Sequence, residues 1–334
     1  IKYMTMKSIY AFILLLTSLI IIQTTASTEQ DKHAPGENVE PPPRRKLKDK
    51  KMLQQVTAAV AKGEMDVLKK LVEEDNADVN AKDMYSVSLL HMVSIRCNPE
   101  IMTYLIEQGA DVNAQLTNVA GHRAGETPLH FAASSRQKEC VKVLIDKGSN
   151  IAMPAREGLT PMHIAAGVGY PDILKIFIDS GADINIEASN DYGSLPIHLA
   201  ATSGDFESVK LLVDHGAIIT TPNKLNATAL HGAAATGSVD IVEYLLARGL
   251  DKHKHILNKD KQTALEVAIS RSNYGEEVKK VLPKLKALLT GDESSTSSSS
   301  GSGSETRDND NNDDEDVIEI SEESEYDDTE NADL

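Results

Sequence analysis

The chain has no tryptophan and few other aromatic residues, only four Phe and nine Tyr among 334 residues. Hydrophobic residues still make up 40% of the sequence, which is enough to form a core. Small aliphatic side chains must therefore do most of the packing. Such a composition favours thin, closely stacked helices over a β-sandwich or a large open sheet.

Cysteine is also scarce. Cys97 and Cys140 are the two cysteines of the chain, too few for a disulfide scaffold. A single bridge between them is compatible with an oxidising compartment. The sequence alone leaves this pairing open.

Motifs that carry catalysis are absent from the sequence. There is no Gly-rich phosphate loop, no nucleophile elbow and no His-Glu-x-x-His. Acidic and basic residues lie mainly at positions expected to face solvent. We therefore expect no enzymatic activity, no cofactor and no nucleic-acid partner.

The net charge of −17 is concentrated at one end of the chain. Residues 291–334 contain seventeen acidic side chains and one base, so this segment carries −16 of the total. It is Ser-rich and then acidic, with too few apolar residues to offset the entropy of ordering, and we expect it to be disordered. Tyr326, which lies between Glu325 and Asp327, is a candidate for sulfation.

Residues 9–22 form an apolar run that follows Lys7. The run is shorter than the roughly 20 residues that a membrane-spanning helix needs. Small residues up to Ala26 follow it, so residues 1–26 are expected to be a cleaved signal peptide, with an uncleaved anchor as the alternative. Residues 27–51, polar and then basic, are predicted to be an extended linker. After cleavage we expect no stable membrane insertion.

A four-residue motif recurs through the middle of the chain. It reads Ser-Leu-Leu-His at 88–91, Thr-Pro-Leu-His at 127–130, Thr-Pro-Met-His at 160–163, Leu-Pro-Ile-His at 195–198 and Thr-Ala-Leu-His at 228–231. The histidines are separated by 39, 33, 35 and 33 residues. A further unit follows at residues 263–266, where Glu266 replaces the histidine, and a degenerate first unit occupies residues 56–83. A fixed period of this size indicates a stacked repeat.

These motifs resemble the ankyrin-repeat family, whose signature is Thr-Pro-Leu-His followed by a helix of small residues. The second half of each unit also resembles it, as in Gly-Ala-Asp-Val-Asn at 109–113 and Gly-Ala-Asp-Ile-Asn at 181–185. The resemblance implies an all-α solenoid of about seven helix-turn-helix units over residues 52–290, joined by finger-like loops. Within the family, the motif histidines are expected to be hydrogen-bonding braces between adjacent repeats.

The residue types support this interpretation independently. A Thr hydroxyl caps a helix, and Pro suits the first helical position because it needs no amide hydrogen there. Alanine pairs allow neighbouring helices to approach closely. Glycines are expected to end each second helix in the left-handed conformation; they are Gly109, Gly148, Gly181, Gly216 and Gly249.

A metal site built from the motif histidines is rejected. One histidine per repeat places the side chains about 10 Å apart, the spacing of packed helices. A shared ion needs ligands about 2 Å from it. His253 and His255 form an isolated His-x-His, and we expect no metal there either.

The resemblance places the partner-binding surface on the loop tips and on the concave side of the first helices. Ten tip residues are candidates for contact: Met84, Tyr85, His122, Arg123, Arg156, Glu157, Asp191, Tyr192, Lys224 and Lys259. Asn226 begins the sequon Asn-Ala-Thr and is a candidate for glycosylation.

The sequence therefore predicts a monomeric, secreted or lumenal binding protein that recognises another protein. Two alternatives remain at this point. The chain is a secreted effector or venom-type component related to ankyrin-bearing toxins, or it is an intracellular adaptor whose leader is an artefact of the reading frame. The expected location is outside the cell, with the endoplasmic reticulum lumen or the cytoplasm as the alternatives.

Overall fold

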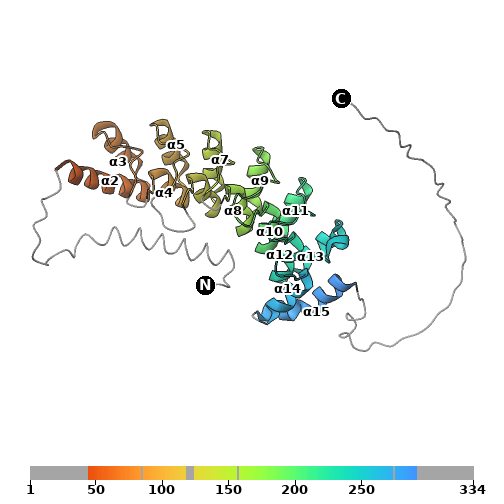
Figure 1. Ribbon diagram of the computed structural model, residues 1–334. Helices are drawn as coiled ribbons and strands as arrows, with labels where there is room; N and C mark the ends of the chain where they lie inside the picture. Colours follow the sequence, from red (N-terminus) through yellow and green to blue (C-terminus); the bar gives the residue numbers. More distant parts are fainter. Residues whose placement is uncertain (1–43, 84–85, 118–123, 156–157, 274, 292–334) are drawn as a thin grey trace, which may run out of the picture. The chain divides into compact units, whose positions relative to one another are not determined.

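The computed structural model describes residues 44–83, 86–117, 124–155, 158–273 and 275–291. Fourteen α-helices lie in these described ranges, arranged as seven successive pairs (Figure 1). The first helix of each pair, called an inner helix here, is α2 (Arg44–Lys62), α4 (Leu89–Arg96), α6 (Pro128–Ser134), α8 (Pro161–Val168), α10 (Pro196–Ser203), α12 (Ala229–Thr236) or α14 (Ala264–Ser272). The outer helices are α3 (Met65–Lys69), α5 (Pro99–Glu107), α7 (Lys138–Asp146), α9 (Pro171–Asp179), α11 (Phe206–Asp214), α13 (Val239–Ala247) and α15 (Glu276–Thr290).

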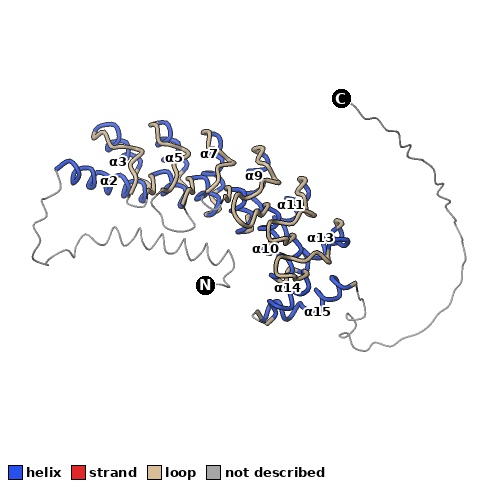
Figure 2. The backbone as a smooth tube through the Cα atoms, viewed as in Figure 1, coloured by secondary structure: helices blue, strands red, loops and turns tan. Residues whose placement is uncertain are grey.

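Two short irregular helices complete the stack. The π-helix η1 (Lys70–Glu74) continues α3, and the 3₁₀-helix η2 (Leu250–His253) follows α13. Inner helices pack against the next inner helix, and from α5 onwards outer helices pack against the next outer helix. Loops connect the pairs, drawn in tan in Figure 2. The prediction of an all-α solenoid with about seven units is confirmed.

Each repeated motif begins an inner helix, as its residues predict. Thr160 is extended, with φ −84° and ψ 167°, and Pro161 is the first helical residue. The unit that lacks Pro behaves in the same way: Ser88 is extended and α4 begins at Leu89. The absence of the Pro therefore does not displace the start of this helix, because the Ser88 and His91 side chains form the same cap as in the other units.

Small residues set the distance between inner helices. Ala165, Ala166, Ala200 and Ala201 are fully buried. Gly232 shows how little room there is, because a Cβ atom added to it would lie 2.6 Å from Oγ1 of Thr202 on α10. Interiors packed this closely accept no additional atom without movement.

The outer helices bury one apolar face and end as predicted. On α9, Ile173, Leu174 and Phe177 are buried. All five predicted glycines have positive φ, between 80° and 104°. A Cβ atom on Gly181 would meet nothing within 4 Å, so the left-handed backbone rather than a lack of space requires glycine there.

The stack begins earlier than the sequence predicts. Residues 44–51 were expected to belong to an extended linker, but they form the first turns of α2. No Gly or Pro interrupts the chain between Pro43 and Gly63, and most of these residues are good helix formers. The expected signal peptide and the acidic segment, residues 292–334, lie outside the described residues, as does the rest of the linker.

Cys97 and Cys140 form a disulfide, with Cα atoms 5.7 Å apart. Cys97 follows the last residue of α4, and Cys140 is fully buried on α7 of the next unit. The bridge therefore joins two consecutive units, in addition to their packing. The sequence left this pairing open, because the two positions are not equivalent within the repeat.

We predict that Gly232→Ala destabilises the protein by about 1–3 kcal/mol, because the new methyl group overpacks the contact with Thr202. Elsewhere in a helix the same change stabilises by up to about 1 kcal/mol. Urea unfolding of Gly232→Ala in the native and Thr202→Ala backgrounds measures the coupling. Equal effects in both backgrounds would show that Thr202 does not restrict this position.

We predict that replacing both cysteines with Ser lowers the free energy of unfolding by up to about 4 kcal/mol. The bridge closes a loop with a sequence separation of 43, and its loss restores entropy to the unfolded chain. Urea unfolding of the double variant, compared with the oxidised and reduced native chain, provides the measurement. A double variant as stable as the oxidised chain would contradict this role.

Candidate functional site

The loops that precede α10, α12 and α14 form compact turns, called fingers here: residues 187–194, 222–227 and 257–262. Each finger is closed by its own backbone hydrogen bond. The Ala188 amide donates to the Ser194 carbonyl, the Asn223 amide to Ala227 and the Asn258 amide to Gln262, with donor–acceptor distances of 2.9–3.1 Å. These turns are therefore defined structures rather than open loops.

Neighbouring fingers are also joined to each other. The Lys224 amide donates to the Tyr192 carbonyl at 2.9 Å, and the Lys259 amide donates to the Leu225 carbonyl at 2.8 Å. These four residues, with Leu257, are called the finger edge. The edge is held together by its backbone, and asparagine side chains add bonds to it: Oδ1 of Asn190 accepts from the Tyr192 amide, and Oδ1 of Asn223 accepts from the Leu225 amide.

The histidine of each motif fixes the base of the following finger. Nδ1 of His163 accepts a hydrogen bond from the Thr160 amide at 3.2 Å, and Nε2 lies 3.0 Å from the Ser194 carbonyl. Because an amide donates to Nδ1, the proton is on Nε2, which donates to the carbonyl. The same pattern recurs at His91, His130, His198 and His231, whose carbonyl partners are Glu126, Leu159, Thr221 and Gln262. The predicted role as braces between repeats is confirmed.

Burial favours the neutral form of three of these imidazoles. It lowers the pKa of His163 to about 4 and that of His198 to about 4, against the raising effect of their carbonyl partners. The pKa of His231 is also lowered by burial. A protonated imidazole would lose the acceptor on Nδ1, so the neutral form is the one that fits the brace.

In the last unit Glu266 occupies the histidine position: it caps α14 as the histidines cap their helices, but among the described residues it makes no bond to a following finger. The Glu266 carboxylate accepts hydrogen bonds from the Thr263 amide at 2.7 Å and from its hydroxyl at 2.9 Å. These bonds to the Thr263 amide and hydroxyl lower the pKa of Glu266. No described unit follows α14, so Glu266 has no further finger to hold.

Four of the ten predicted contact residues lie in the described fingers. Asp191 and Lys259 are exposed, and Tyr192 is 55% exposed. Lys224 pairs with Glu187 of the preceding finger at 3.0 Å, so it links two fingers as well as facing solvent. The other six lie outside the described residues: Met84, Tyr85, His122, Arg123, Arg156 and Glu157.

Sequence reasoning did not identify Leu257, which is 47% exposed on the finger edge. It also gave no sign of the backbone bonds between fingers, because a backbone bond leaves no residue signature. The residue type of Gly158 hints at close contact with the next finger. A Cβ atom there would lie 2.2 Å from the Ser189 amide nitrogen, and the φ of Gly158 is +67°.

Asn226 is exposed and left-handed, with φ 53°. Its side-chain amide donates a hydrogen bond to the Leu257 carbonyl of the next finger. Thr228 of the same sequon is buried as the cap of α12. In the folded chain the sequon therefore already has a structural role, and glycosylation of Asn226 stays a prediction. Tyr326 lies outside the described residues.

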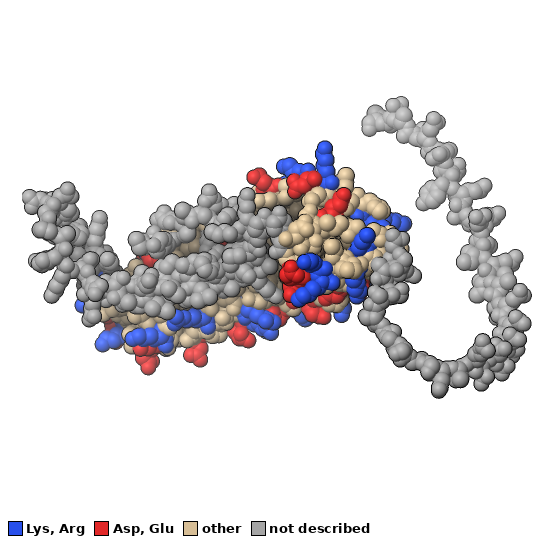
Figure 3. Space-filling model, turned by 90° about the horizontal axis from the view of Figure 1, so that it is seen from below, with Lys and Arg blue, Asp and Glu red and all other residues tan. Residues whose placement is uncertain are grey.

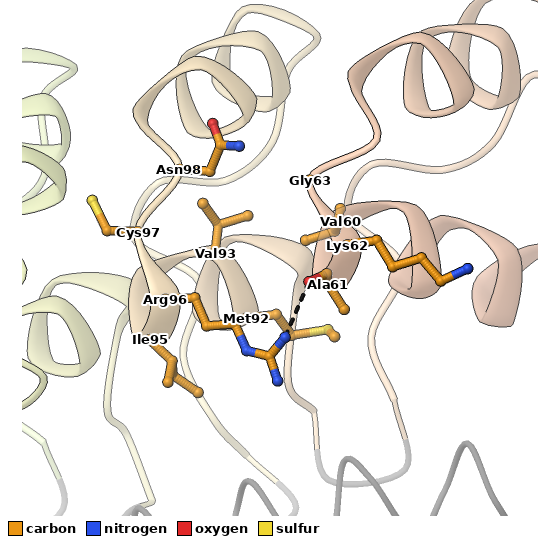
Figure 4. Close-up of a pocket in the computed structure, with 10 residues that line it drawn as sticks. All are labelled: Val60, Ala61, Lys62, Gly63, Met92, Val93, Ile95, Arg96, Cys97 and Asn98. Atoms are coloured by element: carbon orange, nitrogen blue, oxygen red, sulfur yellow. Dashed lines mark hydrogen bonds between the residues drawn. The ribbon is translucent and has the colours of Figure 1, made fainter.

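A hollow of about 220 Å³ lies between the ends of α2 and α4 (Figure 4). Val60, Met92 and Ile95 supply much of its apolar lining. One guanidinium nitrogen of Arg96 donates to the Ala61 carbonyl at 3.0 Å, which ties the two helices together. The hollow is thus an apolar depression at the first two units, with a cation beside it.

Two absences hold for the described residues. No cluster of three or more His, Cys, Asp or Glu side chains there is arranged to hold a metal ion, and His253 and His255 belong to no such group. No helix in the described ranges has the length and apolar character needed to cross a membrane.

We predict that the protein loses stability as the pH falls from about 6.5 towards 4. The histidines have a lowered pKa in the folded state, so the unfolded chain binds more protons in this range. At pH 5 the loss is on the order of 2 kcal/mol for each of His163 and His198. Urea unfolding at pH 7.5, 6 and 5 measures it. Constant stability over this range would contradict the brace.

Comparison with known proteins gives one consistent family. The family described as ankyrin repeats (3 copies) matches residues 90–188 and 197–290, and a second description, ankyrin repeats (many copies), matches residues 168–213.

The curated relatives are similar over short stretches. The chain is 39% identical over 56 residues to the palmitoyltransferase akr1 of Schizosaccharomyces pombe, which covers 17% of this chain and 9% of that protein. It is 30% identical over 96 residues to the E3 ubiquitin-protein ligase hecd-1 of Caenorhabditis elegans, covering 29% and 3%. It is 40% identical over 67 residues to the putative ankyrin repeat protein FPV219 of fowlpox virus, covering 20% and 14%. The chain thus spans a small fraction of the length of these relatives.

Two solved structures have a similar fold. The human ASB11 ankyrin repeat domain has a TM-score of 0.56 at 26% identity, covering 68% of this chain and 96% of that one. The ankyrin repeat domain of Bcl-3 has a TM-score of 0.55 at 24% identity, covering 68% and 97%.

Proposed function

Since the chain belongs to the ankyrin-repeat family, we propose that it is a non-catalytic, secreted or lumenal module that binds another protein through its finger edge and inner helices. The observation that carries this proposal is the lacing of consecutive fingers by backbone hydrogen bonds.

A laced edge favours binding because it is ordered before the partner arrives. Ordering a loop on binding reduces affinity, and a pre-formed surface avoids much of that cost. Tyr192 and Leu257 are large and exposed on this edge. Tyrosine is among the residues that most often supply the binding energy of a protein interface, and Leu257 adds apolar surface beside it.

The disulfide supports the proposed compartment. Structural disulfides persist in oxidising environments and are rare in the cytosol. The Cys97–Cys140 bridge joins two units of the stack. Together with the apolar run at residues 9–22, it favours export or retention in the endoplasmic reticulum lumen over the cytoplasmic alternative.

The compartment is tested by expressing the chain from Met6 in a eukaryotic secretory cell. Mass spectrometry of medium and lysate then gives the N-terminus, the state of the two cysteines and any glycan on Asn226. A chain in the medium that begins near Ser27 and carries the bridge is expected. An intact, reduced chain confined to the cytosol would rule out the proposed compartment.

We predict that a photo-crosslinking residue at Tyr192 or Leu257 captures one defined partner from the medium of the producing tissue. The same residue at Lys142 or Lys210, which are exposed on the outer helices α7 and α11, is the matched control and should not capture it. Crosslinking followed by mass spectrometry identifies the adduct. Capture of the same partner only by the probes on the outer helices would contradict a binding surface on the finger edge.

A further inference from the structure

The charge of the stack changes sign along its length. Residues 44–51, the first turns of α2, carry six basic side chains and one acidic one, a net charge of +5. Residues 52–247 carry 14 basic and 24 acidic side chains, a net charge of −10, and residues 248–290 carry 10 basic and 5 acidic ones, a net charge of +5. Basic and acidic side chains lie side by side on the face shown in Figure 3, so the sign has to be followed element by element. Both ends of the stack are therefore basic, and its middle is acidic.

The last outer helix, α15, carries four of the ten basic residues of this C-terminal part. Val278, Leu285 and Leu289 are buried on the side that packs towards the stack. The solvent-facing part of the helix carries four exposed lysines, interspersed with the exposed Glu276 and Glu277. We call these lysines the α15 basic face: Lys279, Lys280, Lys284 and Lys286.

One further lysine lies near the C-terminal end of the helix. Nζ of Lys254, in the loop after η2, would lie 3.7 Å from a Cβ atom added to Gly291, but this side chain is only 15% exposed and pairs with Asp251 at 2.9 Å. With a rise of about 1.5 Å per residue, the distance along the helix from Lys279 to Gly291 is about 18 Å. The lysines therefore form a track rather than a single point charge.

Most acidic neighbours neutralise this face weakly. Lys279 and Lys280 pair with Glu276 and Glu277 at 3.5 and 3.1 Å, and these two carboxylates are 78% and 87% exposed. Exposed pairs of this kind contribute little and exchange readily with other charges. Lys284 pairs with Glu243 of α13 at 2.8 Å, and Lys286 has no ion pair with any described residue.

The surroundings of the face restrict the class of ligand. None of the large exposed apolar residues lies on α15, so the face lacks the anchor that a protein interface or a membrane-inserting helix needs. It presents lysines and no described aromatic side chain or arginine, whereas single-stranded nucleic acid is held by stacking on such groups. A ligand that is recognised by charge alone fits best.

We propose that the α15 basic face binds a linear sulfated polysaccharide. This surface is separate from the finger edge, and the proposal does not depend on the protein-binding function. Sulfate groups along the polymer pair with successive lysines and release the counterions that surround both surfaces. The whole chain carries a net charge of −17 and as a whole repels a polyanion. Binding to a sulfated polysaccharide would therefore have to occur at a local basic surface.

The test uses the full chain and a defined heparin oligosaccharide, with binding measured by calorimetry at several salt concentrations. The variant Lys279→Gln/Lys280→Gln/Lys284→Gln/Lys286→Gln should reduce affinity about tenfold or more at ~0.1 M salt. It should also reduce the slope of log affinity against log salt by about three to four, roughly one for each lost contact. Circular dichroism and thermal unfolding establish that the variant is folded.

Two control variants remove the same number of charges elsewhere. Lys142→Gln/Lys147→Gln/Lys175→Gln/Lys210→Gln alters the outer helices and should bind as the native chain does. Arg44→Gln/Arg45→Gln/Lys46→Gln/Lys48→Gln alters the other basic run of the chain, on α2, and should also bind normally. Failure of the native chain to bind heparin, or loss of binding in the α2 variant instead of the α15 variant, would overturn the proposal. Equal affinity for a single-stranded oligonucleotide or for vesicles that contain phosphatidylserine would overturn the assignment to a sulfated polysaccharide.

Discussion

The hydrogen bond from each motif histidine to the next unit is the interaction on which the rest of the structure depends. One ring nitrogen belongs to the cap of an inner helix and the other reaches the carbonyl at the base of the following finger. A single side chain thus fixes the start of a helix and the position of its neighbour's loop. Because the bond needs a neutral, buried imidazole, it also makes the order of the fingers sensitive to protonation.

The histidine brace and the backbone hydrogen bonds between fingers do not use the side chains of Tyr192 and Lys224, so these side chains can change without breaking those bonds. Tyr192 and Lys224 differ in chemistry, yet they meet through their main chains. The residues available for contact with a partner are therefore different from those that stabilise the stack: the former are exposed side chains on the fingers, and the latter are buried histidines and alanines and the glycines at helix ends. The Cys97–Cys140 bridge joins two units near the N-terminal end, and the lysines of α15 cover the other end with charge.

Local chemistry made much of the fold predictable. Pro161 and Thr160 specify a helix start, and Gly181 specifies a helix end, because each residue type has one conformation that suits it. The histidine brace was predicted from the family resemblance, which indicated a hydrogen bond to the adjacent repeat; the sequence pattern alone does not indicate it. The start of α2 was misplaced because the basic run at residues 44–51 has high helix propensity and also the polarity of a linker. The disulfide and the lacing of the fingers depend on distances between units, for which the residues carry no local signal. The exposed Leu257 was missed because its position in the repeat resembles that of any loop residue.

The central claim is that the fingers form one ordered edge before any partner binds. Amide hydrogen exchange, followed residue by residue by NMR, tests it most directly. The amides of Lys224 and Lys259 donate to the neighbouring finger, so the account predicts that they exchange as slowly as amides in the inner helices. Exchange at these two amides as fast as in an unstructured peptide would contradict it, because the fingers would then be independent loops.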